Sequence, residues 1–126
     1  MSIELDHLVL AVNDRAKSIE FYGHILGFAR EADDGPFSVL RVGPGFVILL
    51  AQWGTRGGEH LAFSMSKKEF DAVFERLKSA SIPYGDRFDQ VGNMKDPGLE
   101  CGARGMGRAL YFFDPDKHLI EIRHYE

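Results

Sequence analysis

The stretch Arg108-Ala-Leu-Tyr-Phe-Phe-Asp-Pro-Asp-Lys-His-Leu-Ile-Glu-Ile-Arg123 decides how the rest of the sequence is interpreted. The apolar and aromatic run Leu110 to Phe113 is typical of a β-strand, and Leu119 to Arg123 is typical of a second one. Between them, Asp114-Pro115-Asp116 predicts a turn, because proline fixes one backbone angle and aspartate favours turn positions. The stretch therefore predicts a β-hairpin.

Glu121 is the ionisable group in this hairpin that needs an explanation. Because side chains alternate along a strand, Ile120 and Ile122 share one face and Glu121 projects from the other. A carboxylate in this place is either solvated at a sheet edge, or it serves as a metal ligand or a catalytic base. The hairpin alone leaves these alternatives open.

The composition is that of one ordinary globular domain. With 126 residues and 44% hydrophobic content, the chain can bury a core without cross-links. A net charge of −4, with no basic stripe, argues against nucleic-acid binding. The single cysteine, Cys101, excludes an internal disulfide and is interpreted as a spectator thiol. The sequence shows neither a secretory leader nor an apolar run of membrane-spanning length, so we expect a cytoplasmic protein without a membrane partner.

A strand, a helix and three further strands are predicted between residues 3 and 53. The branched aliphatic stretch Ile3 to Val12 predicts a strand with both faces buried. Asn13 or Asp14 can cap the following helix, and Gly27 is placed to end it. Glycine-rich breaks then separate three expected strands, at residues 28–31, 36–42 and 46–53.

The same order of elements begins again at residue 59. His60 to Met65 predicts a short strand, and Ser66-x-x-Glu69 is the capping-box pattern that opens a helix. Ile82-Pro83 is expected to end that helix. A strand at 84–88, a long glycine-containing loop at 89–105 and the hairpin complete the second half.

The two halves form an internal repeat. The segment Asp6 to Val9 aligns with Glu59 to Ala62, so His7 matches His60, and Leu49 matches Glu121 near the far end of each half. A module with one helix and one small sheet cannot bury both faces of its sheet, so the two are expected to pack around a shared core or cleft. We predict an α+β fold in which two βαβββ modules, at about 3–53 and 59–124, form a cup-shaped mixed sheet in a single domain.

His7, His60 and Glu121 are the strongest candidates for a functional site. They lie at equivalent positions of the repeat, on the faces that we predict to be turned away from the helices. Ala62 and Ser64 share the face of His60 and are small enough to leave a hollow. Two imidazoles and a carboxylate suit one divalent ion, such as Fe, Mn, Zn or Ni. The alternative is three separately satisfied buried polar groups, and it is weaker because one metal would satisfy all three.

Four motifs extend this interpretation along nearly the whole chain: DHLVLAVND at 6–14, FYGHILGF at 21–28, EHLAF at 59–63 and YFFDPDKHLIEI at 111–122. Together they resemble the vicinal oxygen chelate superfamily, which includes glyoxalase I, extradiol dioxygenases, fosfomycin-resistance enzymes, methylmalonyl-CoA epimerase and bleomycin-resistance proteins. The resemblance implies a cup-shaped sheet that holds one divalent metal through His7, His60 and Glu121. Substrate oxygens are then expected to complete the coordination.

Individual members of that superfamily differ from this sequence at functional positions. Glyoxalase I carries a fourth, carboxylate ligand where this chain has Leu49, which argues against glyoxalase I activity. Ring-cleaving dioxygenases share a tyrosine ten residues before the glutamate, matched here by Tyr111, but also use histidines that the loop 89–105 lacks. Fosfomycin-resistance enzymes match the ligands and Tyr111, yet part of their phosphonate site lies past the last strand, whereas this sequence stops at Glu126.

Several other residues are given supporting roles. Tyr111 is expected to position or protonate a substrate oxyanion. Arg104 and Arg108 flank the glycine-rich approach to Tyr111 and could clamp an anionic substrate. Gln52 and Trp53 are expected to line the cup. Solvated positions are expected for three further histidines, His24, His118 and His124.

Two functions of different classes are consistent with this interpretation. The first is a metal-dependent lyase, isomerase, dioxygenase or ring-opening transferase that binds vicinal oxygens of a small substrate and stabilises negative charge on them. The alternative is a protein of the bleomycin-resistance type that sequesters a ligand without chemistry. In both cases exposed strand edges and the resemblance predict a homodimer, which could exchange modules between its chains.

Overall fold

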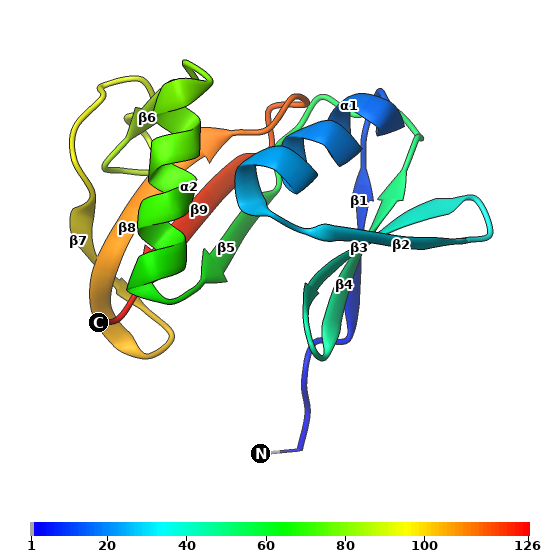
Figure 1. The fold of residues 1–126 in the computed structure, drawn as a ribbon, viewed down its shortest axis with the longest axis horizontal. Helices are drawn as coiled ribbons and strands as arrows, with labels where there is room; N and C mark the ends of the chain where they lie inside the picture. The colour runs from blue at the N-terminus through cyan, green and yellow to red at the C-terminus, as the bar shows by residue number, and fades with distance from the viewer. Residues whose placement is uncertain (1) are drawn as a thin grey trace. The chain divides into compact units, whose positions relative to one another are not determined.

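The computed structural model describes residues 2–126, and the chain divides into two compact units, Met1–Arg56 and Gly57–Glu126. Each unit has its own mixed sheet and its own helix, so the predicted α+β class is confirmed (Figure 1). Within residues 2–126, no helix has both the length and the apolar character needed to cross a membrane.

The first unit contains β1 (His7–Ala11), α1 (Arg15–Phe21), the π-helical turn η1 (Tyr22–Leu26), β2 (Ala29–Asp34), β3 (Phe37–Gly43) and β4 (Phe46–Ala51). Its strands lie in the order β1-β4-β3-β2, with β1 parallel to β4 and the other pairs antiparallel. As predicted, Asp14 caps α1 by accepting a hydrogen bond from the Lys17 N–H at 3.2 Å. Gly27 ends the helical segment with a φ of 76°, a conformation that glycine adopts without strain.

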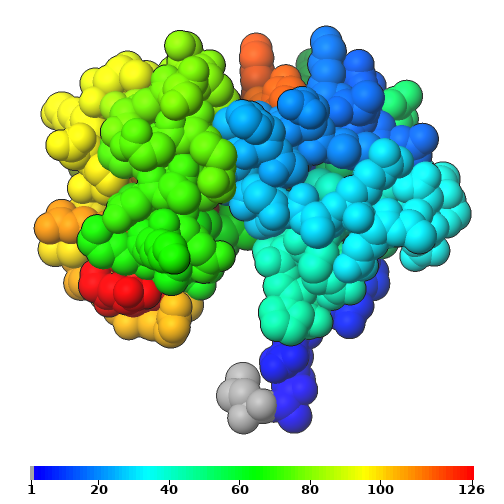
Figure 2. All heavy atoms as spheres, viewed as in Figure 1, coloured from blue at the N-terminus to red at the C-terminus, as the bar shows by residue number. Residues whose placement is uncertain are grey.

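The first strand is shorter and more exposed than the sequence predicts. A strand with two buried faces is expected over Ile3 to Val12, but β1 begins at His7. The register places His7 opposite Val47 near the start of β4, and among residues 2–6 the ladder is extended by the Asp6 carbonyl, which accepts from the Val47 N–H at 3.4 Å. Ile3 and Leu5 are 86% and 70% exposed. In Figure 2 this part of the chain stands clear of the rest of the first unit.

The second unit contains β5 (His60–Ser64), α2 (Lys67–Ser79), β6 (Tyr84–Gly85), β7 (Gly98–Gly102), β8 (Gly105–Phe113) and β9 (Leu119–His124). Its main sheet has the order β5-β9-β8-β6, and β7 also pairs with β8. The predicted hairpin is present as β8 and β9, and α2 lies across their sheet in Figure 1. Ser66 and Glu69 form the predicted capping box at the start of α2.

The predicted loop at 89–105 contains a strand that the sequence does not reveal. This strand, β7, runs antiparallel to β8, which begins at Gly105 rather than at Leu110. Glycine at both ends gives β7 the composition of a loop, and only its pairing with β8 makes it a strand. The strand expected at 84–88 is reduced to two residues. The second unit therefore has one strand more than the predicted βαβββ order.

The strand registers of the two units correspond. In each unit the first strand lies at the edge of the sheet and begins with a histidine. This strand pairs in parallel with the last strand of the unit. The equivalent pairs are His7–Val47 and His60–Leu119 at the start of the ladders, and Val9–Leu49 and Ala62–Glu121 two residues later. The alignment of Leu49 with Glu121 in the sequence thus agrees with their places in the two sheets.

Candidate metal centre

His60 and Glu121, two of the three predicted metal ligands, meet in the second unit. They come from the adjacent parallel strands β5 and β9, and His60 Nε2 lies 3.0 Å from Glu121 Oε1. The His60 side chain is 46% exposed, whereas that of Glu121 is only 7% exposed. The imidazole is therefore accessible to solvent, and the carboxylate is held in the sheet surface beneath it.

The alternation predicted for β5 is present around this pair. Ala62 and Ser64 are exposed on the face of His60, and Phe63 is buried on the opposite face. Small side chains beside the imidazole leave it open to an approaching ligand.

Tyr111 completes the group on this face. It lies on β8 directly opposite Glu121, and its ring meets the His60 ring edge-on with 6.0 Å between centroids. Burial, together with the negative charge of Glu121, raises the pKa of Tyr111 to about 12. The phenol is therefore protonated at neutral pH and can act as a hydrogen-bond donor.

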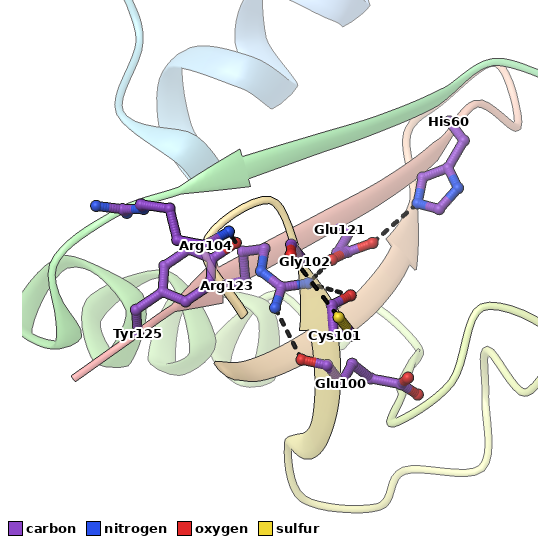
Figure 3. A network of polar contacts seen from close by, with 8 residues as sticks. All are labelled: His60, Glu100, Cys101, Gly102, Arg104, Glu121, Arg123 and Tyr125. Atoms are coloured by element: carbon purple, nitrogen blue, oxygen red, sulfur yellow. Dashed lines mark hydrogen bonds and ion pairs between the residues drawn. The ribbon is translucent and has the colours of Figure 1, made fainter. Parts of the chain in front are cut away.

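Arg123 is the residue of this site that the sequence analysis does not identify. Its Nη1 donates to Glu121 Oε2 at 2.8 Å, and its side chain is 6% exposed. Figure 3 shows His60 and Arg123 reaching Glu121 from opposite sides. The signal was available, because a residue two positions after Glu121 on a strand projects from the same face.

The buried charge of Arg123 is compensated by several partners. Its Nη2 donates to the Glu100 carbonyl at 2.9 Å, and its Nη1 lies 3.5 Å from the Cys101 carbonyl. The guanidinium also stacks over the Tyr125 ring, 4.8 Å from its centroid. Arg123 is thus tied both to the candidate ligand and to strand β7.

Neither of the two predicted clamp residues touches this carboxylate. Arg104 stacks over the Tyr125 ring at 4.4 Å, and Figure 3 shows its guanidinium pointing away from Glu121. Arg108 lies three residues before Tyr111 on β8, so it projects from the opposite face of the sheet, beside His124. This placement does not support a contact between Arg108 and a ligand bound at Glu121.

The remaining predicted site residues belong to the first unit. His7 Nδ1 lies 2.7 Å from Asp6 Oδ2, so Nδ1 carries the proton and Nε2 is the nitrogen suited to a metal. Gln52 Oε1 accepts a hydrogen bond from the Arg15 N–H at 2.9 Å and so caps the start of α1. The Trp53 side chain is exposed. In residues 2–126, neither unit by itself gathers three His, Cys, Asp or Glu side chains as a metal would require.

The prediction of solvated positions is wrong for two histidines. His118 and His124 are 1% and 4% exposed. His118 Nδ1 accepts from the Glu59 N–H at 3.2 Å, which connects the β8–β9 turn to the start of β5, and His124 packs edge-on against Phe70. His124 lies two residues after the buried Ile122 and shares its face of β9, and this pattern could have predicted its burial. His24 is exposed, as expected.

The donor atoms of His60 and Glu121 fit a divalent ion. Two ligands at right angles around a metal, each about 2.1 Å from it, lie about 3.0 Å apart, which is also the length of an ordinary N–H···O hydrogen bond. The separation of His60 Nε2 and Glu121 Oε1 is 3.0 Å. An imidazole nitrogen and a carboxylate oxygen are also the ligand types that Zn, Mn and Fe(II) accept. The role of His7 as a third ligand stays a prediction.

Comparison with known proteins agrees with the fold and the motifs. Residues 4–122 match the Glyoxalase/Bleomycin resistance protein/Dioxygenase superfamily. The sequence is similar to "Glutathione transferase FosA" of Serratia marcescens, with 26% identity over 94% of this chain and 78% of that protein. It is also similar to "Virulence protein STM3117" of Salmonella typhimurium, with 30% identity over 96% of this chain and 83% of that protein.

Two solved structures show the same architecture over the full length of this chain. The structure of STM3117 matches with a TM-score of 0.79 at 29% identity, covering 100% of this chain and 99% of that one. "Oxidase ChaP-H2" matches with a TM-score of 0.81 at 27% identity, covering 100% of this chain and 96% of that one. The chain belongs to the glyoxalase/bleomycin resistance protein/dioxygenase superfamily.

Proposed function

We propose that this protein is a divalent-metal-dependent enzyme that acts on a small substrate bound through neighbouring oxygen atoms. The observation that carries the proposal is the convergence of His60 Nε2 and Glu121 Oε1, whose 3.0 Å separation is that of a hydrogen bond and also fits two adjacent ligands of one metal. His7, the repeat-related histidine, is the proposed third ligand. One metal ion held by these residues would supply a Lewis acid for negative charge that develops on a substrate oxygen.

The other side chains of the site support this chemistry. Tyr111, with its pKa raised to about 12, is a protonated donor at neutral pH and can hydrogen-bond to a substrate oxyanion. The exposed His60 side leaves room for a substrate to approach, while the buried Glu121 is held in one orientation. The chain's residues thereby orient the substrate and hold the proton that it would receive.

The reaction class is proposed as lyase, isomerase, dioxygenase or ring-opening transferase. Transfer to a small electrophile is supported by the relatives named "Glutathione transferase FosA" and "Metallothiol transferase FosB", each 26% identical to this chain. Oxygen chemistry is supported by the structural neighbour named "Oxidase ChaP-H2". Screening metal-loaded protein against epoxides with thiols, catechols and α-keto-thioester adducts separates these reactions.

The test of the proposal is the metal content of protein purified without chelator. We expect about one divalent ion per chain, and loss of that ion in His60→Ala and in Glu121→Gln, with the circular dichroism spectrum retained. The fold should persist because the packed sheets do not need the ion, whereas metal at about 100 times its Kd adds only about 2.7 kcal/mol. Absence of a stoichiometric ion after metal-supplemented expression would refute the proposal.

The Arg123–Glu121 ion pair favours a second candidate, a protein that sequesters a ligand without chemistry. Arg123 Nη1 lies 2.8 Å from Glu121 Oε2, so the guanidinium neutralises the carboxylate without any metal. Both side chains are less than a tenth exposed. A metal-free protein that still binds small ligands would support this candidate, and the same metal analysis distinguishes it from the enzyme.

A further inference from the structure

The two oxygens of the Glu121 carboxylate have different partners. Arg123 Nη1 donates to Oε2 at 2.8 Å, while Oε1 lies 3.0 Å from His60 Nε2. Rotating the carboxylate by a quarter turn would break both contacts. Its orientation is therefore set by Arg123 on one side and leaves one oxygen toward the imidazole.

Arg123 is itself fixed by a strand that is not its neighbour in the sheet. β8 lies between β9, which carries Arg123, and β7. The guanidinium reaches across β8 and donates to the Glu100 carbonyl of β7 at 2.9 Å, as Figure 3 shows. The Tyr125 ring covers it at 4.8 Å. Groups on β9 and β7, together with the Tyr125 ring just after β9, thus determine where the guanidinium lies.

Two glycines provide the space for this reach. A Cβ atom at Gly102 would collide with Arg123 Cζ, and one at Gly107 would lie 3.2 Å from Arg123 Nη2 and 2.6 Å from the His124 carbonyl oxygen. Glycine within a strand commonly marks a place where another group approaches the backbone closely. Gly102 of β7 and Gly107 of β8 therefore leave the space that the Arg123 side chain occupies.

We propose that Arg123 is a positioning residue that makes Glu121 a ligand through one oxygen only. With Oε2 held by the guanidinium, Oε1 is the oxygen left for a divalent ion at His60. The inference rests on the metal-dependent function proposed above. Carboxylates that bind metals are commonly fixed by further hydrogen bonds, and charge-assisted bonds from arginine are the strongest of these. An ion pair that served only the fold would not alter how Glu121 binds a metal.

Infrared difference spectra of zinc-loaded minus metal-free protein test this inference, with zinc alone as the probe. They isolate the carboxylate whose stretching bands change on metal binding. The antisymmetric and symmetric bands are far apart for a carboxylate bound through one oxygen and close together for one bound through two. We expect a wide separation in the wild type and a narrowed one in Arg123→Met. Arg104→Met is the matched control, because Arg104 stacks on the same Tyr125 ring and should leave the bands unchanged.

The outcomes separate this inference from the proposed function. A narrow separation in the wild type, or an unchanged one in zinc-bound Arg123→Met, would overturn the inference and leave the metal-dependent function standing. Failure of the wild type to bind zinc would overturn both. Removing one partner of a buried ion pair could prevent folding of Arg123→Met, and in that case the wild-type spectrum alone decides the proposal.

Discussion

Substitution of Gly102 by alanine should destabilise the protein, although alanine is normally the better residue in a strand. Gly102 does not have a positive φ, so alanine meets no backbone strain there. Its Cβ would instead collide with Arg123 Cζ and with the Tyr125 hydroxyl, and would lie 2.6 Å from Arg123 Nη2. The cost of the substitution therefore depends on which of these neighbours can move.

The size of the effect follows from what Arg123 would lose. Displacing the Tyr125 side chain costs about 1 kcal/mol of modest overpacking, but it does not relieve the collision with Arg123 Cζ. If Arg123 also shifts, it weakens its bonds to the Glu121 carboxylate at 2.8 Å and to the Glu100 carbonyl at 2.9 Å. Such bonds contribute about 1 kcal/mol each, and more when charged. We therefore expect Gly102→Ala to lower the free energy of unfolding by about 2 to 3 kcal/mol.

Urea unfolding of metal-free protein, followed by far-ultraviolet circular dichroism, measures this change. Chelator is kept in the buffer so that metal binding does not contribute to stability. Gly45→Ala is the control, because a Cβ there meets nothing within 4 Å and the φ is not positive. That variant should be unchanged or stabilised by up to about 1 kcal/mol. Equal stabilities of the two variants would refute the view that Gly102 exists to accommodate Arg123.

Three further predictions concern a turn, a tyrosine and the assembly. Lys117 has a φ of 67°, so Lys117→Gly should raise stability by about 0.5 to 1 kcal/mol in thermal unfolding, and Lys117→Ala should bring no gain. Because the pKa of Tyr111 is raised from 10.0 to about 12, its contribution to stability should be complete below pH 10 and should be lost as the pH rises toward 12. Tyr111→Phe should flatten that part of the stability curve and remove the latest step of the tyrosinate absorbance titration; an unchanged titration would contradict the assignment. We also expect a dimer by light scattering, and a mass near 14.2 kDa would exclude it. If the dimer exchanges modules, mixing His7→Ala with Glu121→Gln chains should restore part of the metal binding, whereas no recovery would show that each chain builds its own site.

Local signals in the sequence predicted the elements that depend on neighbouring residues. The capping box of Ser66 and Glu69 and the Asp14 cap act within one turn of a helix, so both were predictable from spacing alone. Alternation along β5 and along β9 likewise predicted the face from which each side chain projects, and the pairing of the two strands then brings His60 and Glu121 within 3.0 Å. What these signals share is that no distant partner is needed to form them.

The errors arose where a distant partner decides the outcome. The alternating run from Ile3 looked like a strand, but its bonding to β4 reaches back only to Asp6. The error at β7 was the reverse. This glycine-flanked segment was predicted to be a loop, but it is a strand because β8 is long enough to pair with it. Arg123 was missed for a related reason. A charged residue at a strand end is usually solvated, and its burial depends on Gly102 and on carbonyls of β7.

The position of β9 in its sheet has a consequence for the order in which the protein can form during synthesis. β9 lies between β5 and β8, and β5 has no other strand partner in the sheet. His60 pairs with Leu119, so this ladder cannot close until residues 119–124 have left the ribosome. The first unit has all its strands by Ala51. We therefore expect the strands of the first unit to pair early in synthesis, while β5 and the apolar face of α2 stay exposed to chaperones until β9 emerges.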